Sequence, residues 1–289
     1  MIYLHRKFKK LIQKFLSNKS KNAEGEQVEM GFFDHIEVLR WHIVRSILSI
    51  VVLGIVFFLN PKFTFEKLVL GPKNENFLTY RLIKKLIPDY GPPKFDLLTR
   101  EMGEQFFVHL KVSFWMGLIC SFPYIFWEFW RFLKPGLYDN EKKAVRGIVF
   151  YCSILFFTGV CFGYFIIAPL AVTWLASYSV GVDVISAPTL ASYVGYMTMF
   201  TIPTGIIFEL PIIFYFLGKV GLVSSAFLRK YRRHSIVIIF IVAAVVTPPD
   251  VVTQILIAFP VLFLYEISIF LVRKQEKQHL KESNLPSNE

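Results

Sequence analysis

Six apolar runs of the chain are long enough, or nearly long enough, to cross a lipid bilayer. A helix rises about 1.5 Å per residue, so roughly 20 apolar residues cross the hydrocarbon core. Hydrophobic residues make up 54% of the chain, and the mean hydropathy is +0.50. These values exceed those of a soluble domain, and we therefore expect an all-α integral membrane protein with six transmembrane helices. The expected spans are Ile43–Leu59, Phe106–Phe126, Ile148–Trp174, Phe200–Leu217, Ser235–Val246 and Val251–Val272.

The positions of Lys and Arg predict the orientation of these spans. With the N-terminus inside, the inner segments hold 22 Lys and Arg and the outer segments hold eight, all between Lys62 and Arg100. Cytoplasmic loops of membrane proteins carry such an excess. We therefore expect both termini to be cytoplasmic, and the first outer segment, about Asn60–Gly103, is long enough to carry structure of its own.

The membrane region is expected to occupy residues 31–272. Residues 1–30 form a basic extension and a linker, and large apolar residues recur at helical spacing between Leu4 and Phe15. That pattern is typical of a helix lying on anionic lipid of the inner leaflet, and a solvated tail fits it equally well. Residues 273–289 are expected to be a polar cytoplasmic tail.

Several functional classes are disfavoured by the composition. The net charge of +11 marks inner loops and contact with anionic lipid more simply than it marks nucleic-acid binding. Cys120, Cys152 and Cys161 fall inside apolar runs without metal-ligand spacing. No catalytic or nucleotide-binding motif is present. We expect no enzyme activity, no cofactor and no metal.

Glu209 lies in the middle of the eighteen-residue run FTIPTGIIFELPIIFYFL, which holds no other charged side chain. This position is near the bilayer midplane, where an ionised carboxylate costs at least ~2.5 kcal/mol on insertion scales. Such a residue indicates a functional site, and the structural alternative is a protonated acid that only joins two helices.

The fifth span is the shortest of the six. Its twelve apolar residues reach only roughly 18 Å, too little to cross an undistorted bilayer alone. It ends at TPPD, where the prolines stop the helix and Asp250 can cap the next one.

Two segments at the inner interface combine carboxylates with aromatic residues. They are FFDHIEVLRWHI, which contains Glu37, and FPYIFWEFWRFLKPGLYDNEKK, which contains Glu141. Such carboxylates can receive guanidinium groups of a partner through paired hydrogen bonds. The alternative is that they pair with Arg40 and other cations of this same chain.

These segments, together with FELPIIF and TPPDVVTQILIAFPVLFLYEI, resemble the TatC family, the multi-spanning receptor subunit of the twin-arginine protein translocase. The resemblance covers about Phe33 to Val272 and implies a concave six-span bundle with short fifth and sixth spans. It also implies that Glu37, Arg40, Phe132, Pro135, Leu137, Tyr138 and Glu141 form the surface that reads paired arginines of a signal peptide. The chain departs from the family pattern at Val38, where a glutamate is usual, because the acid lies one residue earlier at Glu37.

The resemblance implies roles in and near the membrane as well. Glu209 matches a buried glutamate on the concave face, and Gln254, Pro248 and Asp250 match the TPPD–Q motif. The region around Ala244 and Val245 is similar to the docking place of a single-span partner subunit. Pro72 matches a proline of the first outer loop.

The function that these features imply is export of folded proteins across the bacterial inner membrane, driven by the proton motive force. The implied partners are twin-arginine signal peptides, single-span subunits of the TatA and TatB type, and further copies of the chain. A secondary transporter of small solutes that uses Glu209 is the alternative, and an inverted repeat of three spans would favour it.

Overall fold

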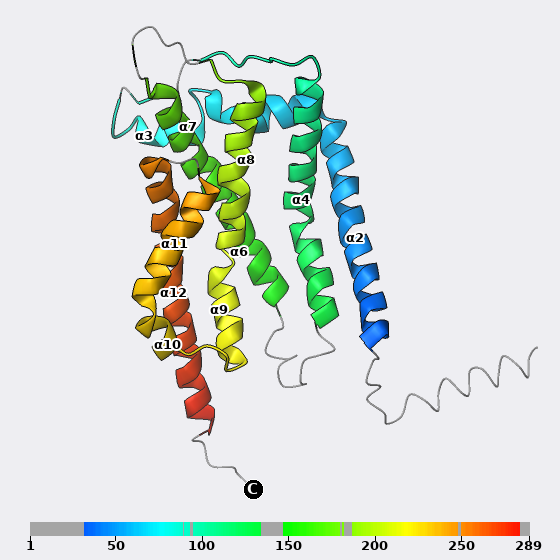
Figure 1. Ribbon diagram of the computed structural model, residues 1–289, viewed down its shortest axis with the longest axis vertical. Coiled ribbons are helices and arrows are strands. Elements are labelled where there is room, and N and C mark those ends of the chain that lie inside the picture. Colours follow the sequence, from blue (N-terminus) through cyan, green and yellow to red (C-terminus); the bar gives the residue numbers. More distant parts are fainter. Residues whose placement is uncertain are drawn as a thin grey trace, which may run out of the picture. The chain divides into compact units, whose positions relative to one another are not determined.

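The computed structural model describes residues 32–88, 90–92, 95–133, 147–179, 181, 187–247 and 250–283. By their internal contacts the residues fall into two units, Met1–Ile43 and Val44–Glu289, with the boundary inside helix α2. Every other described helix belongs to the second unit. Figure 1 shows the helices coloured along the sequence. No strand occurs in the described ranges, apart from one bridge between Leu98 and Thr189.

The long helices follow the predicted order. They are α2 (Phe32–Phe58), α4 (Glu104–Leu133), α6 (Ile148–Phe162) with η4 (Gly163–Ile167) and α7 (Ala168–Ser177), α8 (Leu190–Ile207) with α9 (Leu210–Lys219), α11 (Arg232–Val246) and α12 (Val251–Ser283). Five of them are long and apolar enough to span a membrane, among the residues that the structure describes. The fifth predicted span, α11, has 15 residues and falls below that length. The chain is therefore an all-helical, multi-pass membrane protein with a short fifth apolar helix.

Two of the predicted spans differ in the structure. The fourth begins at Leu190, ten residues earlier than expected, and it is divided into α8 and α9 at Phe208 and Glu209. Pro211 explains this break, because proline lacks the N–H that would continue the helical ladder. The prediction of a short sixth span is wrong, because α12 has 33 residues and continues into the segment expected to be a polar tail.

The segment between α2 and α4, which the sequence analysis expects on the outer side, carries structure of its own, as predicted. It contains η1 (Lys62–Val69), η2 (Gly71–Lys73) and α3 (Leu78–Ile83). At the opposite end, α10 (Ser225–Lys230) joins α9 to α11 (Figure 1). The side chains of Thr189 and Ser224 cap α8 and α10, and each accepts the N–H group three residues ahead.

The core of the second unit lies where α6, α8, α9 and α12 pack together. Phe156, Phe200 and Ile257 are almost completely buried there. A Cβ on Gly159 would lie 2.7 Å from the Cβ of Phe208, so a glycine is needed for α6 to approach the end of α8 this closely. Small residues allow such close approaches between membrane helices, where packing replaces the hydrophobic effect as the main attraction.

Candidate functional site

Glu209 is buried at the break between α8 and α9. Its side chain is 7% exposed, and neither carboxyl oxygen has a partner in hydrogen-bonding geometry within the described residues. The Cys152 thiol and the backbone of Phe156, both on α6, interact with it electrostatically but not in that geometry. A buried polar group without a hydrogen bond is costly and rare in a folded protein. Within the described residues, the hydrogen-bonding capacity of this carboxyl group is therefore left unused.

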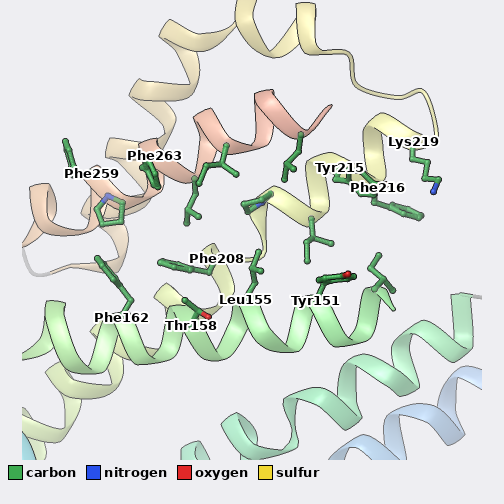
Figure 2. Close-up of a pocket in the computed structure, with 17 residues that line it drawn as sticks. Tyr151, Leu155, Thr158, Phe162, Phe208, Tyr215, Phe216, Lys219, Phe259 and Phe263 are labelled. Carbon is green, nitrogen blue, oxygen red and sulfur yellow. The ribbon is translucent and has the colours of Figure 1, made fainter. Parts of the chain in front are cut away.

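A large apolar pocket adjoins this break. It has a volume of about 860 Å³ and is lined by α6, α9 and α12, with Phe208 at the end of the α8 segment (Figure 2). Phe208 and Pro211 flank Glu209 in the chain and both line the pocket. Aromatic side chains from three elements face it, among them Tyr151, Tyr215 and Phe263. The pocket thus offers a mainly apolar surface beside an unpaired carboxyl group.

Helix α11 exposes the residues predicted to dock a partner. Val245 is 78% exposed and Ala244 is also exposed. The Nε2 of Gln254 donates to the Phe240 carbonyl at 3.0 Å and joins α12 to α11, and its role toward a partner stays a prediction. Asp250 accepts the Thr253 N–H at 2.8 Å and caps α12, as predicted. Pro248 lies outside the described residues.

The predicted signal-peptide residues are only partly described. Phe132 lies in the last turn of α4 and is half-buried, and Glu37 and Arg40 are exposed on the first part of α2. Pro135, Leu137, Tyr138 and Glu141 lie outside the described residues. Whether these residues form one surface stays a prediction.

The structure adds a carboxylate that the sequence analysis missed. Glu128 on α4 is 1% exposed, accepts a hydrogen bond from the Tyr124 hydroxyl at 2.9 Å, and lies 3.8 Å from Arg45 of α2. The sequence feature that could have indicated Glu128 is its place as the only acid in the aromatic run FPYIFWEFWRF. Its partners were not predictable from local spacing, because one of them comes from another helix.

Pro72 is buried in η2, and the chain before it is held by tyrosines. Tyr164 of η4 donates to the Leu68 carbonyl at 2.6 Å, and Tyr193 of α8 donates to the Val69 carbonyl at 3.0 Å. In the same outer segment the Tyr80 hydroxyl lies 3.0 Å from the Thr173 hydroxyl, and burial raises the pKa of Tyr80. Two membrane helices therefore fix the position of the segment that leads into Pro72.

Known proteins resemble the chain over most of its length. The family model described as "Sec-independent protein translocase protein (TatC)" matches residues 34–260. The chain belongs to the TatC family. It is similar to the TatC protein of Blattabacterium sp. subsp. Periplaneta americana, with 35% identity covering 86% of this chain and 97% of the relative. The TatC protein of Aquifex aeolicus is 33% identical, covering 84% of this chain and 94% of the relative.

Solved TatC structures share the fold. A crystal structure of the twin-arginine translocase receptor TatC superposes with a TM-score of 0.65 at 33% identity, covering 82% of this chain and 97% of that one. A second, in the detergent DDM, has a TM-score of 0.66 and 33% identity, covering 83% and 99%. The TatC family is a family of protein translocase components and is not known for enzyme activity. Among the described residues no group of three or more His, Cys, Asp or Glu could hold a metal ion.

Proposed function

We propose that this chain is the receptor and core subunit of a twin-arginine translocase in a bacterial inner membrane. In this proposal it binds twin-arginine signal peptides, recruits single-span subunits of the TatA and TatB type, and exports folded proteins with energy from the proton motive force. Several copies assemble in the working complex. The observation that carries the proposal is the unpaired, buried carboxyl group of Glu209 beside an apolar pocket.

Signal-peptide recognition is assigned to the inner interface. Glu141, with Phe132, Pro135, Leu137 and Tyr138, occupies the family's reading segment, and Glu37 and Arg40 belong to the other reading segment. Paired arginines need carboxylates, because a guanidinium group forms two parallel hydrogen bonds with a carboxylate. Glu141 is the principal acceptor in this proposal.

Partner recruitment is assigned to the membrane. A single-span helix is an apolar cylinder, and the pocket between α6, α9 and α12 presents an apolar surface to it. A polar side chain on that helix can satisfy Glu209, which removes the cost of the unpaired group. The exposed Ala244 and Val245 on α11 offer a second contact.

Recognition is tested with a synthetic signal peptide and the purified full chain. We expect an Arg-Arg peptide to bind at least roughly tenfold more tightly than a Lys-Lys peptide, because lysine lacks the planar fork of donors. Glu141→Gln should remove this preference, and the matched control Glu75→Gln in the outer segment should keep it. Equal binding of the two peptides, or an unchanged preference in Glu141→Gln, contradicts the receptor role.

Recruitment is tested by copurification with a single-span partner. Glu209→Ala should leave signal-peptide binding intact and should abolish partner copurification and transport. Val245→Asn should also weaken copurification, whereas the control Val251→Asn, at a position 69% exposed on α12, should not. Unchanged copurification in both Glu209→Ala and Val245→Asn contradicts the assignment of the partner site.

A further inference from the structure

The connection between α9 and α11 gathers cations on exposed positions. We call residues 220–235, which include α10, the α10 corner. Within it Arg229, Lys230, Arg232 and Arg233 follow one another closely, and all four side chains are exposed. Orientation by the Lys and Arg count puts this corner at the inner membrane surface.

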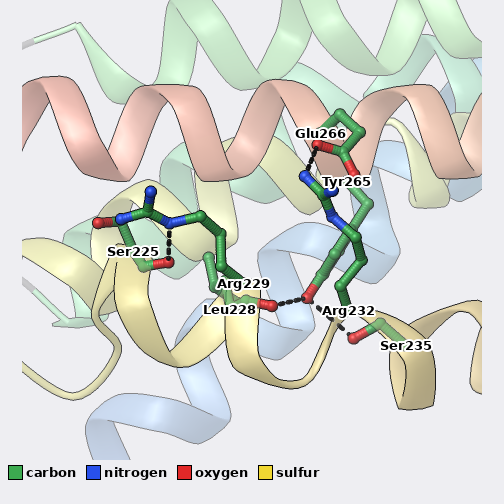
Figure 3. Close-up of polar contacts among 7 residues, drawn as sticks. All are labelled: Ser225, Leu228, Arg229, Arg232, Ser235, Tyr265 and Glu266. Atoms are coloured by element: carbon green, nitrogen blue, oxygen red, sulfur yellow. Dashed lines mark hydrogen bonds and ion pairs between the residues drawn. The ribbon is translucent and has the colours of Figure 1, made fainter.

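The corner is fixed in place by polar contacts with α12. The Tyr265 hydroxyl donates to the Leu228 carbonyl at 2.8 Å and accepts from the Ser235 hydroxyl at 2.9 Å (Figure 3). The Ser225 N–H donates to Glu276 at 2.8 Å. These bonds fix both ends of α10, so the cations project from a preorganised backbone, which lowers the entropy cost of binding a ligand.

Only part of this positive charge is neutralised within the chain. Arg232 forms an ion pair with Glu266 at 2.6 Å (Figure 3). Arg229 uses its Nε to donate to the Ser225 carbonyl at 3.2 Å, which leaves its terminal amino groups for a ligand. Arg229, Lys230 and Arg233 have no carboxylate within 4 Å in the described ranges. Three cations therefore remain to attract an anion.

Exposed apolar side chains occur in the same corner and continue from it into α11. Phe227 is 51% exposed and its ring lies 4.6 Å from that of Tyr231, and Leu222 is 72% exposed. Further along α11, Val237 and Ile241 are 58% and 57% exposed. A cationic group that continues into an exposed apolar helix face matches the phosphate and the acyl chains of a lipid.

We propose that the α10 corner is a binding site for an anionic glycerophospholipid. Arg229, Lys230 and Arg233 hold the phosphate of the headgroup, and the acyl chains lie along Val237 and Ile241 in the first part of α11, before the partner contact at Ala244 and Val245. The continuous apolar face favours a lipid over a soluble acidic protein, because such a protein has no contact to make with Val237 and Ile241. The site does not depend on the translocase role of the chain.

The test uses the full chain in detergent and counts bound lipids by native mass spectrometry. The probe is dioleoyl phosphatidylglycerol, with dioleoyl phosphatidylcholine as the uncharged comparison. The variant Arg229→Gln/Lys230→Gln/Arg233→Gln should retain phosphatidylglycerol roughly tenfold more weakly, since each cation at a membrane surface contributes to the attraction. The matched control Arg273→Gln/Lys274→Gln/Lys277→Gln loses the same charge from α12 and should retain it normally.

A charge-preserving variant guards against misfolding. Arg229→Lys/Arg233→Lys should retain most of the phosphatidylglycerol binding, because an ammonium group still attracts a phosphate. Equal loss in both triple variants, or equal retention of the two lipids, overturns the site. Displacement of the lipid by glycerol phosphate or by a soluble acidic peptide at similar concentration also overturns it, because the acyl chains would then contribute nothing.

Discussion

Glu104 and Glu209 are equally buried glutamates in very different surroundings. Each side chain is 7% exposed. Glu104, at the start of α4, accepts the Arg100 N–H at 2.7 Å and the Ala191 N–H at 2.9 Å, so each of its oxygens has a partner. Glu209 has no such partner among the described residues. Two glutamates with the same exposed fraction thus differ in their hydrogen bonds, which are satisfied at Glu104 and unsatisfied at Glu209 within the described residues.

The contrast extends to the regions around the two residues. Around Glu104, the Leu98 carbonyl accepts the Leu190 N–H at 2.9 Å, and tyrosines hold the nearby outer segment. Next to Glu209 in the chain, Phe208 and Pro211 line a large, mainly apolar pocket. A buried carboxylate is evidence of function only after its hydrogen bonds have been counted, because burial alone does not separate the two cases.

Replacing Glu104 should cause the largest loss of stability. Glu104→Ala leaves the N–H groups of Arg100 and Ala191 unpaired and releases the start of α8 from α4. We expect a large fall in melting temperature, measured in detergent by fluorescence-detected size exclusion. The exposed neighbour Glu101 provides the control, and Glu101→Ala should melt like the wild type. A normal melting temperature in Glu104→Ala would contradict the stabilising role of Glu104 and, with it, the contrast with Glu209.

Gly159→Ala should be the next most damaging change. The added Cβ would meet Phe208 at 2.7 Å and the Thr204 carbonyl at 2.8 Å, directly before Glu209. Overpacking of this kind costs about 1–3 kcal/mol, measured as a lower melting temperature. The same substitution at Gly195, where no atom lies within 4 Å of the new Cβ, should be neutral or slightly stabilising. Equal behaviour of both variants would show that α6 and α8 have room to separate.

Tyr193→Phe should have a smaller effect. It removes the hydroxyl that donates to the Val69 carbonyl and leaves the ring in place, which costs about 1 kcal/mol for a buried hydrogen bond. Tyr178, which is 67% exposed, provides the comparison, and Tyr178→Phe should leave the melting temperature unchanged. If both variants are neutral, the tyrosines do not stabilise the outer segment.

Glu209→Gln should have the smallest effect on stability and a severe effect on transport. The amide keeps the shape of the side chain and removes no hydrogen bond within the described residues. We expect an unchanged melting temperature together with loss of export of a twin-arginine reporter. A marked loss of stability would assign Glu209 to the same structural class as Glu104.

The apolar pattern of the sequence predicts the order of the helices but not all of their limits. The start of α8, LASYVGYMTM, is too polar for a hydropathy argument, and its hydroxyls prove to be bonded inside the protein, as Tyr193 and Thr198 show. The end of α12 was missed because a helix can continue into water after its apolar part ends.

The candidate site could be predicted where a single residue stands out from the residues around it in the sequence. Glu209 is conspicuous as a lone acid in an apolar run, and Pro211 explains the helix break beside it. Glu104 lies in a polar stretch, and its partner Ala191 is 87 residues away, so no local pattern indicates the contact. The Gln254 amide donates to the Phe240 carbonyl of α11, 14 residues away, which no local pattern indicates either.

The shortness of α11 has an elastic consequence for the surrounding bilayer. At 1.5 Å per residue, the 30 residues from Leu190 to Lys219 reach roughly 45 Å and the 15 residues of α11 roughly 22 Å. Lipid beside α11 must therefore be compressed relative to lipid beside α8 and α9, at a cost that rises with each ångström of mismatch.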